Sequence, residues 1–86
     1  MILLPPDASR YPSGDLVFSA HARSRMRQRD IREEDVRHIA VYGTSVPDAS
    51  PPGAPPRTRS IGFRNGRRIT VVIAHERDRR VVITVF

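Results

Sequence analysis

The chain is short and strongly basic, and both properties limit what it can do. Its 86 residues include 15 basic side chains, all of them arginine, against 9 acidic ones, for a formal net charge of +6. A chain of this length supports one domain with a modest core, which excludes an enzyme with a cleft between two lobes. Arginine suits bidentate contact with phosphate, although a GC-rich genome also depletes lysine.

The chain contains no cysteine, which excludes disulfides, thiolate metal sites and cysteine nucleophiles. No apolar run approaches the roughly 18 residues of a membrane span. The first residues also lack the basic lead-in and long apolar core of a secretion signal. We therefore expect a cytoplasmic protein without a membrane partner, and delivery to target cells as part of a larger system stays open.

The first half of the chain predicts an arm and then a helix. Residues 1–15 are rich in proline and have few apolar positions, which is typical of a flexible N-terminal arm before a single domain at residues 16–86. Leu16 to Phe18 predicts a short strand or a hydrophobic staple. Ser19 is a candidate N-cap for a first helix that extends through a stretch free of Gly and Pro to Asp30.

A second helix follows closely. Asp30 and Glu33 have the spacing of a capping box, and further acidic residues follow where the positive end of the helix dipole favours them. Val36 and Ile39 recur at helical spacing, and Gly43 ends the run. The sequence therefore predicts two consecutive helices joined by a tight turn that Asp30 caps.

The next segment, residues 44–57, holds five prolines and one glycine. This composition rules out a helix and any strand longer than a few residues, so a mobile connector is expected. Three strand-like runs come after it, at residues 58–64, 67–74 and 81–86. Asn65-Gly66 between the first two is the strongest short signal for a type I′ hairpin.

A second hairpin is expected at the charged loop of residues 75–80. In the run before it, Ile69, Val71 and Ile73 alternate with Val72 and Ala74, so both faces of this strand carry apolar groups. One face should pack on the helices, and the other is partly covered or awaits a partner. The expected fold class is α+β, with two N-terminal helices packed on a three- to four-stranded antiparallel sheet.

The first helix carries a stripe of polar side chains. Residues four apart lie about 40° from one another on a helix, so His21, Arg25 and Arg29 form one line. Ala22 and Met26 beside this line should face the core. Arginine can neutralise phosphate oxygens and histidine can move a proton, which suits a phosphodiester. The alternative is a solvated flank of an amphipathic helix.

The other histidines, His38 and His75, are interpreted as a boundary residue and a solvated turn residue, with an acid or base role for His75 as the alternative. The histidines lack metal-ligand spacing, so we expect no metal and no cofactor. Basic side chains gather around the first hairpin and should attract an RNA backbone without reading its sequence. They are Arg57, Arg59, Arg64, Arg67 and Arg68.

Thr84 stands out within the apolar final run. The alternation of side chains along a strand places Thr84 on the same face as Val82 and Phe86. A threonine is common in any strand. The functional alternative is a hydroxyl directed at the stripe on the first helix.

The sequence FSAHARSRMRQRDI from Phe18 to Ile31, followed by EEDV, resembles the opening motif of domain-of-unknown-function family 4258. That motif reads H-A-x-x-R-M-x-x-R-x-I and is followed by a helix with an acidic start. The final run at residues 81–86 is similar to the closing strand of the family. The resemblance covers residues 16–43 and 58–86.

This resemblance implies a RelE-like fold. The fold is named BECR after the RelE, barnase and colicin-type ribonucleases, and bacterial toxins use it. Such enzymes cleave RNA without a metal and use the substrate 2′-hydroxyl as the nucleophile. Matched to the motif, His21, Arg25, Arg29 and Thr84 become the candidate catalytic residues. The resemblance also implies an acidic antitoxin or immunity protein as a partner. The rival hypotheses are a non-catalytic RNA-binding module and a protein that binds only an acidic partner; the sequence does not predict the oligomeric state.

Overall fold

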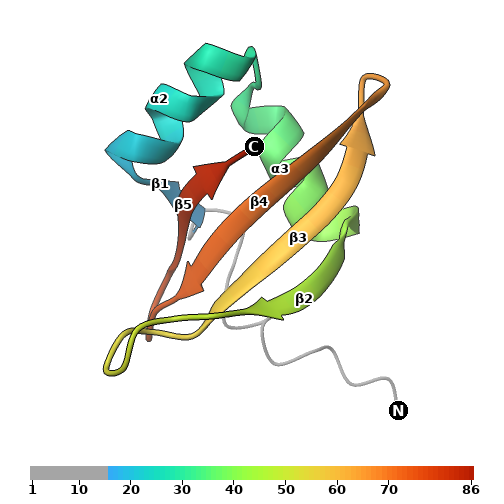
Figure 1. Ribbon diagram of the computed structural model, residues 1–86. Helices are drawn as coiled ribbons and strands as arrows, with labels where there is room; N and C mark the ends of the chain where they lie inside the picture. Colours follow the sequence, from blue (N-terminus) through green and yellow to red (C-terminus); the bar gives the residue numbers. More distant parts are fainter. Residues whose placement is uncertain (1–15) are drawn as a thin grey trace.

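The computed structural model describes residues 16–86, and the N-terminal arm expected at residues 1–15 lies outside this part. The described chain forms two helices and one five-stranded sheet with the strand order β1-β5-β4-β3-β2 (Figure 1). The elements, in chain order, are β1 (Leu16–Phe18), α2 (Ala20–Arg29), α3 (Glu33–Tyr42), β2 (Thr44–Asp48), β3 (Arg57–Arg64), β4 (Arg67–His75) and β5 (Arg80–Val85).

The expected sheet of three to four antiparallel strands is wrong. Leu16–Phe18 is the edge strand β1, and it precedes the two helices. It pairs in parallel with β5, with Leu16 beside Arg80 and Phe18 beside Val82. The other three pairs are antiparallel, so the sheet is mixed. A parallel partner far along the chain leaves no local turn signal, and the sequence could not reveal this pair.

The connector expected at residues 44–57 is also partly wrong, because its first five residues form β2, Thr44–Asp48. β2 pairs only with β3, so it is the other edge of the sheet. An edge strand accepts a proline such as Pro47 because one side of its backbone needs no partner in the sheet. The prolines of residues 44–57 are therefore evidence against a central strand in this segment, but they do not exclude an edge strand such as β2.

The turn between the helices differs from the prediction as well. Asp30 ends α2 with φ 54°, in the left-handed region, and does not begin the next helix. α3 begins after Arg32, whose backbone N–H donates to Oδ2 of Asp35 at 3.0 Å. The capping box expected from Asp30 and Glu33 is thus wrong, and the Asp35 carboxylate, two residues beyond Glu33, accepts from the N-cap backbone in its place.

The remaining local predictions are confirmed. The Ser19 hydroxyl caps α2 by accepting from the backbone N–H of Ala22 at 3.0 Å. Gly43 caps the end of α3. Asn65 and Gly66 have φ of 55° and 80° in the turn between β3 and β4, as a type I′ hairpin requires. The charged loop before β5 likewise joins two antiparallel strands.

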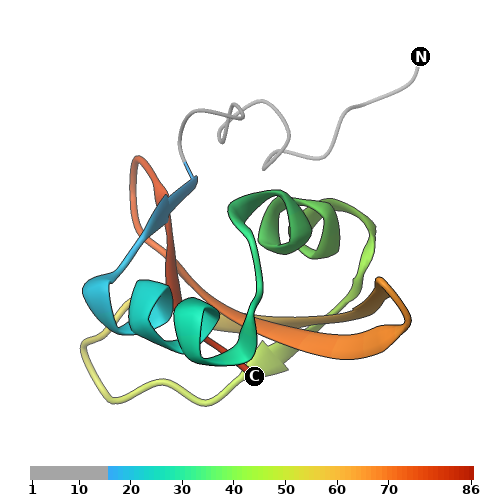
Figure 2. The same ribbon diagram turned by 90° about the horizontal axis from the view of Figure 1, so that it is seen from above.

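The core lies between the two helices and one face of the sheet. Ala22 and Met26 of α2 are buried, as the helical spacing predicts, and Val36 and Ile39 of α3 join them. The sheet contributes the buried face of β4 and two residues of β5: Ile69, Val71, Ile73, Val82 and Val85. Figure 2 shows α3 against the hairpin of β3 and β4, and α2 displaced toward β5.

Gly43 lies at a close approach between the end of α3 and β3. A Cβ at this position would lie 2.6 Å from the carbonyl oxygen of Ile39 and 2.9 Å from that of Ile61. Both are backbone atoms, so Gly43→Ala must move α3 or β3. We expect it to lower the free energy of unfolding by roughly 1–3 kcal/mol, measured by urea denaturation. The exposed Val41→Ala on the same helix should leave stability unchanged, and equal stability of the two variants would contradict this packing.

Candidate functional site

The face of the sheet opposite the helices is the candidate site, and we call it the open face. The strand registers give its side chains in rows. One row contains Val46, Arg59, Val72 and Thr84, and the next contains Thr44, Ile61, Thr70 and Phe86. Phe63 and Arg68 form a third, shorter row. None of the described helices packs on this face. Val72 and Thr70 in its middle strand are nevertheless buried, so the more exposed side chains around them, such as Arg68 and Phe63, are the ones available to a ligand.

A bulge in β5 decides which way Thr84 points. The register places Val82 beside Ile73 and Thr84 beside Val72, so Ile83 is an extra residue in this strand. Val82 is fully buried in the core. Thr84 lies on the opposite side, on the open face. The expectation that Thr84 and Val82 share a face is therefore wrong, because a bulge interrupts the two-residue alternation.

The five arginines expected around the hairpin separate onto two faces. Arg57, Arg59 and Arg68 lie on the open face, in register with Ala74, Val72 and Phe63. Arg64 and Arg67 alternate with them and lie on the helix side. Arg59 contacts Asp48 of β2 at 3.4 Å, whereas no ion pair is recorded for Arg57 or Arg68 among residues 16–86. The open face thus keeps part of its positive charge unneutralised.

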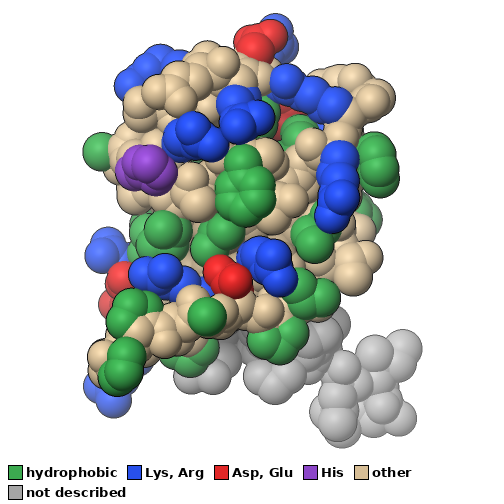
Figure 3. All heavy atoms as spheres, in the orientation of Figure 1, with side chains coloured by type: hydrophobic (Ala, Val, Ile, Leu, Met, Phe, Trp, Pro, Cys, Tyr) green, Lys and Arg blue, Asp and Glu red, His purple; other side chains and the backbone are tan. Residues whose placement is uncertain are grey.

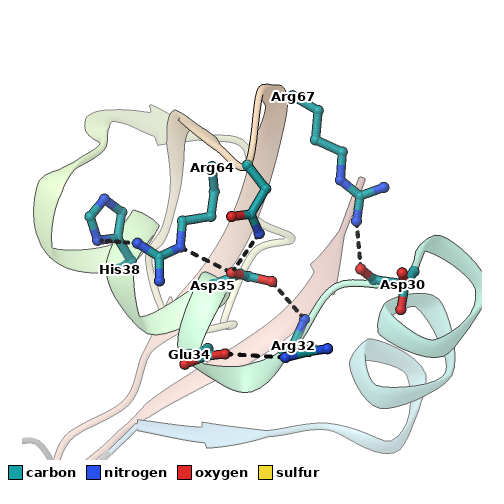
Figure 4. Close-up of polar contacts among 8 residues, drawn as sticks. Asp30, Arg32, Glu34, Asp35, His38, Arg64 and Arg67 are labelled. Carbon is teal, nitrogen blue, oxygen red and sulfur yellow. Dashed lines mark hydrogen bonds and ion pairs between the residues drawn. The ribbon is translucent and has the colours of Figure 1, made fainter.

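Arg64 and Arg67 bind the hairpin to the helices (Figure 4). Nε of Arg64 donates to Oδ1 of Asp35 at 3.0 Å, and the Asn65 side chain donates to the same oxygen at 3.3 Å. Arg64 also contacts Nδ1 of His38 at 3.2 Å. Arg67 donates to the carbonyl oxygen of Asp30 at 2.6 Å. These contacts give both arginines a structural role.

Asp35 is the centre of this network and is only 3% exposed. The hydrogen bond from the Arg32 backbone lowers the pKa of Asp35, and the hydrogen bond and charge of Arg64 lower it further, although burial acts in the opposite direction. A charged Asp35 therefore stabilises both the first turn of α3 and the docked hairpin. Sequence spacing shows Asp35 only as one of three acidic residues in a row.

The stripe on α2 lies on the flank of the helix that faces away from α3. The opposite flank carries Arg23, which pairs with Glu33 of α3 at 3.6 Å. Arg25 donates to Oε1 of Gln28 in the same helix at 3.4 Å, and this is its one recorded polar contact within residues 16–86. His21 and Arg29 are exposed, and no hydrogen bond or ion pair is recorded for either one among residues 16–86. The structure thus leaves the stripe available for binding.

α2 is attached to the sheet beside Thr84. The backbone N–H of Ser19 donates to the Val82 carbonyl oxygen at 3.0 Å, and its hydroxyl donates to that of Ile83, also at 3.0 Å. His21 follows two residues later, in the first turn of the helix. In Figure 3, a histidine and arginines over α2 occupy the same side of the molecule as arginines over the sheet. Figure 3 thus shows positive charge over α2 and over the sheet on one side of the molecule.

The other two histidines have structural contacts away from the open face. His38 lies beside Arg64 and its ring is 4.9 Å from that of Tyr42. Nε2 of His75 is 2.8 Å from the hydroxyl oxygen of Thr58. Within residues 16–86, no group of three or more His, Cys, Asp or Glu side chains is arranged to hold a metal ion.

Two connected depressions lie on the open face, with aromatic side chains at their rims. The larger, of about 470 Å³, is lined by Tyr42 and Phe63 among others, and the smaller, of about 340 Å³, by Phe86. Arg68 lines both. Sequence reasoning missed these aromatic residues. The alternation of Arg57, Arg59 and Phe63 along β3 was the available signal, because residues two apart share a face.

None of the helices in the described part of the chain has the length and apolar character needed to cross a membrane. No curated protein and no solved structure matches the chain. A family model described as a domain of unknown function, DUF4258, matches residues 18–86. The match includes both helices, the open face and every residue of the α2 stripe. The chain belongs to the DUF4258 family.

Proposed function

We propose that this chain is a metal-independent ribonuclease of the toxin type, which cleaves RNA through attack by the substrate 2′-hydroxyl. The observation that supports this proposal is that His21 and Arg29, both exposed and without a recorded partner among residues 16–86, lie on the helix that is attached to the sheet beside Thr84. A polyanion such as RNA would gain from contact with the α2 stripe and the open face at once. The BECR resemblance supports the same reaction.

In this reaction the 2′-oxygen forms a bond to phosphorus while the bond from phosphorus to the 5′-oxygen breaks. The products are a 2′,3′-cyclic phosphate and a free 5′-hydroxyl. A base takes the proton of the 2′-hydroxyl and an acid gives one to the leaving oxygen, and His21 would act as one of these groups. Arg25 and Arg29 would stabilise the added negative charge on phosphorus.

The open face would hold the rest of the substrate. Arg57, Arg59 and Arg68 would contact phosphates along the RNA backbone. Thr84, next to the attachment point of α2, would orient the nucleotide that is cleaved. Arg64 and Arg67 are left out of this set, because their guanidinium groups bind Asp35 and the carbonyl oxygen of Asp30.

The test is incubation of the purified full chain with total RNA in excess chelator. We expect RNA fragments with 2′,3′-cyclic phosphate ends, because no step of the reaction needs a metal. Fragment ends identify the chemistry: a 3′-phosphate without a cyclic precursor, or cleavage only after added Mg²⁺, would contradict the mechanism. Intact RNA would reject the ribonuclease proposal itself.

A non-catalytic RNA-binding module is the second candidate. The observation in its favour is that His21 is the only histidine of residues 16–86 on this side, and Asp48 pairs with Arg59 there. A second histidine is thus missing from the described site. This candidate predicts salt-sensitive RNA binding without cleavage. An acidic antitoxin or immunity protein would cover the same basic side in either case.

A further inference from the structure

Three large aromatic side chains are exposed on the open face or at its rim. Tyr42 is 76% exposed, Phe63 is 71% exposed and Phe86 is 46% exposed. An aromatic ring left in water contributes no burial energy to folding, so three such side chains around two neighbouring depressions indicate a ligand with flat apolar groups. The same surface contains Arg68 and so also attracts negative charge.

The pairing of the strands gives the positions of Phe63, Arg68 and Phe86 relative to one another. Phe63 lies directly beside Arg68 on the neighbouring strand. Phe86 exchanges two backbone hydrogen bonds with Thr70, at 2.7 and 2.9 Å, and so belongs to the adjacent row. Phe63 and Phe86 are therefore two strands and one row apart, which corresponds to about 12 Å. Arg68 lies between them and lines both depressions.

We infer that the open face binds single-stranded RNA, with one base stacked on Phe63, a second on Phe86 and the intervening phosphate on Arg68. The inference rests on the proposed function and specifies its substrate class. Aromatic side chains stack on bases of any sequence, whereas a duplex hides the base faces inside its own stack. An acidic protein would satisfy Arg68 but would not require two separated rings.

The experiment measures fluorescence anisotropy of a labelled 2′-O-methyl oligonucleotide of about ten nucleotides, within the usual site size for such surfaces. The methyl group blocks the 2′-hydroxyl, so cleavage cannot alter the result. Phe63→Ala and Phe86→Ala should each weaken binding by about five-fold or more, with the salt dependence unchanged. The exposed Val41→Ala, outside both depressions, is the matched control and should bind like the wild type.

Arg68→Ala should behave differently. Loss of one phosphate contact reduces the slope of log affinity against log salt by about 0.7 for a single strand. Arg27→Ala, on α2 and outside the stripe, should leave the slope unchanged. A duplex of the same sequence should bind more weakly than the single strand. Duplex binding at equal strength, or Phe63→Ala and Phe86→Ala variants with wild-type affinity, would overturn the inference.

The chain contains no tryptophan, so Phe63→Trp introduces a single fluorescent reporter of stacking. We expect the oligonucleotide to quench this indole, and an abasic sugar–phosphate chain of equal length to leave it bright. Val41→Trp is the control and should not be quenched. Quenching of the Phe63→Trp variant without chelator-resistant RNA cleavage would reject only the ribonuclease proposal. Cleavage without quenching of that variant would reject only the stacking inference.

Discussion

Replacing His21 by alanine is expected to lower the rate of RNA cleavage by about 100-fold or more, the usual contribution of a general acid or base. His21 is exposed and has no recorded partner among residues 16–86, so its removal should not change the folded structure. The measurement is the initial rate of cleavage of a defined RNA in excess chelator, together with the melting temperature of each variant.

Arg27→Ala is the matched control, because Arg27 is an exposed basic residue of the same helix outside the stripe. It should cleave at the wild-type rate, whereas Arg29→Ala should be impaired through loss of charge stabilisation. If His21→Ala cleaves as fast as Arg27→Ala, then His21 has no catalytic role. Equal impairment of Arg27→Ala and Arg29→Ala would indicate general attraction of RNA to the basic helix.

Replacing Asp35 by alanine should lower the free energy of unfolding by roughly 2–3 kcal/mol. The variant loses the hydrogen bond to the Arg32 backbone and the contacts with Arg64 and Asn65. Both the start of α3 and the hairpin attachment are then weakened. The measurement is the midpoint of urea denaturation at neutral pH. Glu34→Ala, which removes only a surface ion pair with Arg32, should leave the midpoint nearly unchanged.

The same carboxylate makes stability depend on pH. The pKa of Asp35 is lowered in the folded chain from its ordinary value of 3.8. Its contribution is therefore complete above that value and is lost as the pH falls through the lowered folded pKa. Below pH 3.8 the wild type should lose more stability than Asp35→Asn, which has no charge to lose. Parallel curves for the two proteins would contradict the assigned role.

The elements with local signals could be predicted from sequence. Ser19, Gly43 and the Asn65-Gly66 pair each define a boundary through their own backbone preferences, and these boundaries are confirmed. β1 was expected only as a strand or staple, because its partner β5 is at the other end of the described chain. β2 was missed because the prolines of its segment suggested a connector, although an edge strand accepts them.

The site was predictable in part for similar reasons. Helical spacing places Ala22 and Met26 in the core correctly. The direction of Thr84 depends on the bulge at Ile83, which the apolar run VVITVF does not reveal. The hairpin arginines were predicted to form one cluster because they are close together in the sequence. In the sheet, side chains alternate between the two faces, so Arg64 and Arg67 lie on the face opposite the open face. The two-residue alternation of each strand, counted outward from the Asn65-Gly66 turn, would have placed Arg64 and Arg67 on the face opposite Arg57, Arg59 and Arg68.

The pairing of β1 with β5 has a consequence for biosynthesis. Residues 16–18 leave the ribosome long before residues 80–82, beside which they lie in the sheet. Sheets closed by such distant partners fold slowly, because a long loop must be ordered first. The open face likewise needs β3, β4 and β5 together. A nascent chain therefore lacks its assembled basic surface until β5 has left the ribosome, while the chain is still next to ribosomal RNA.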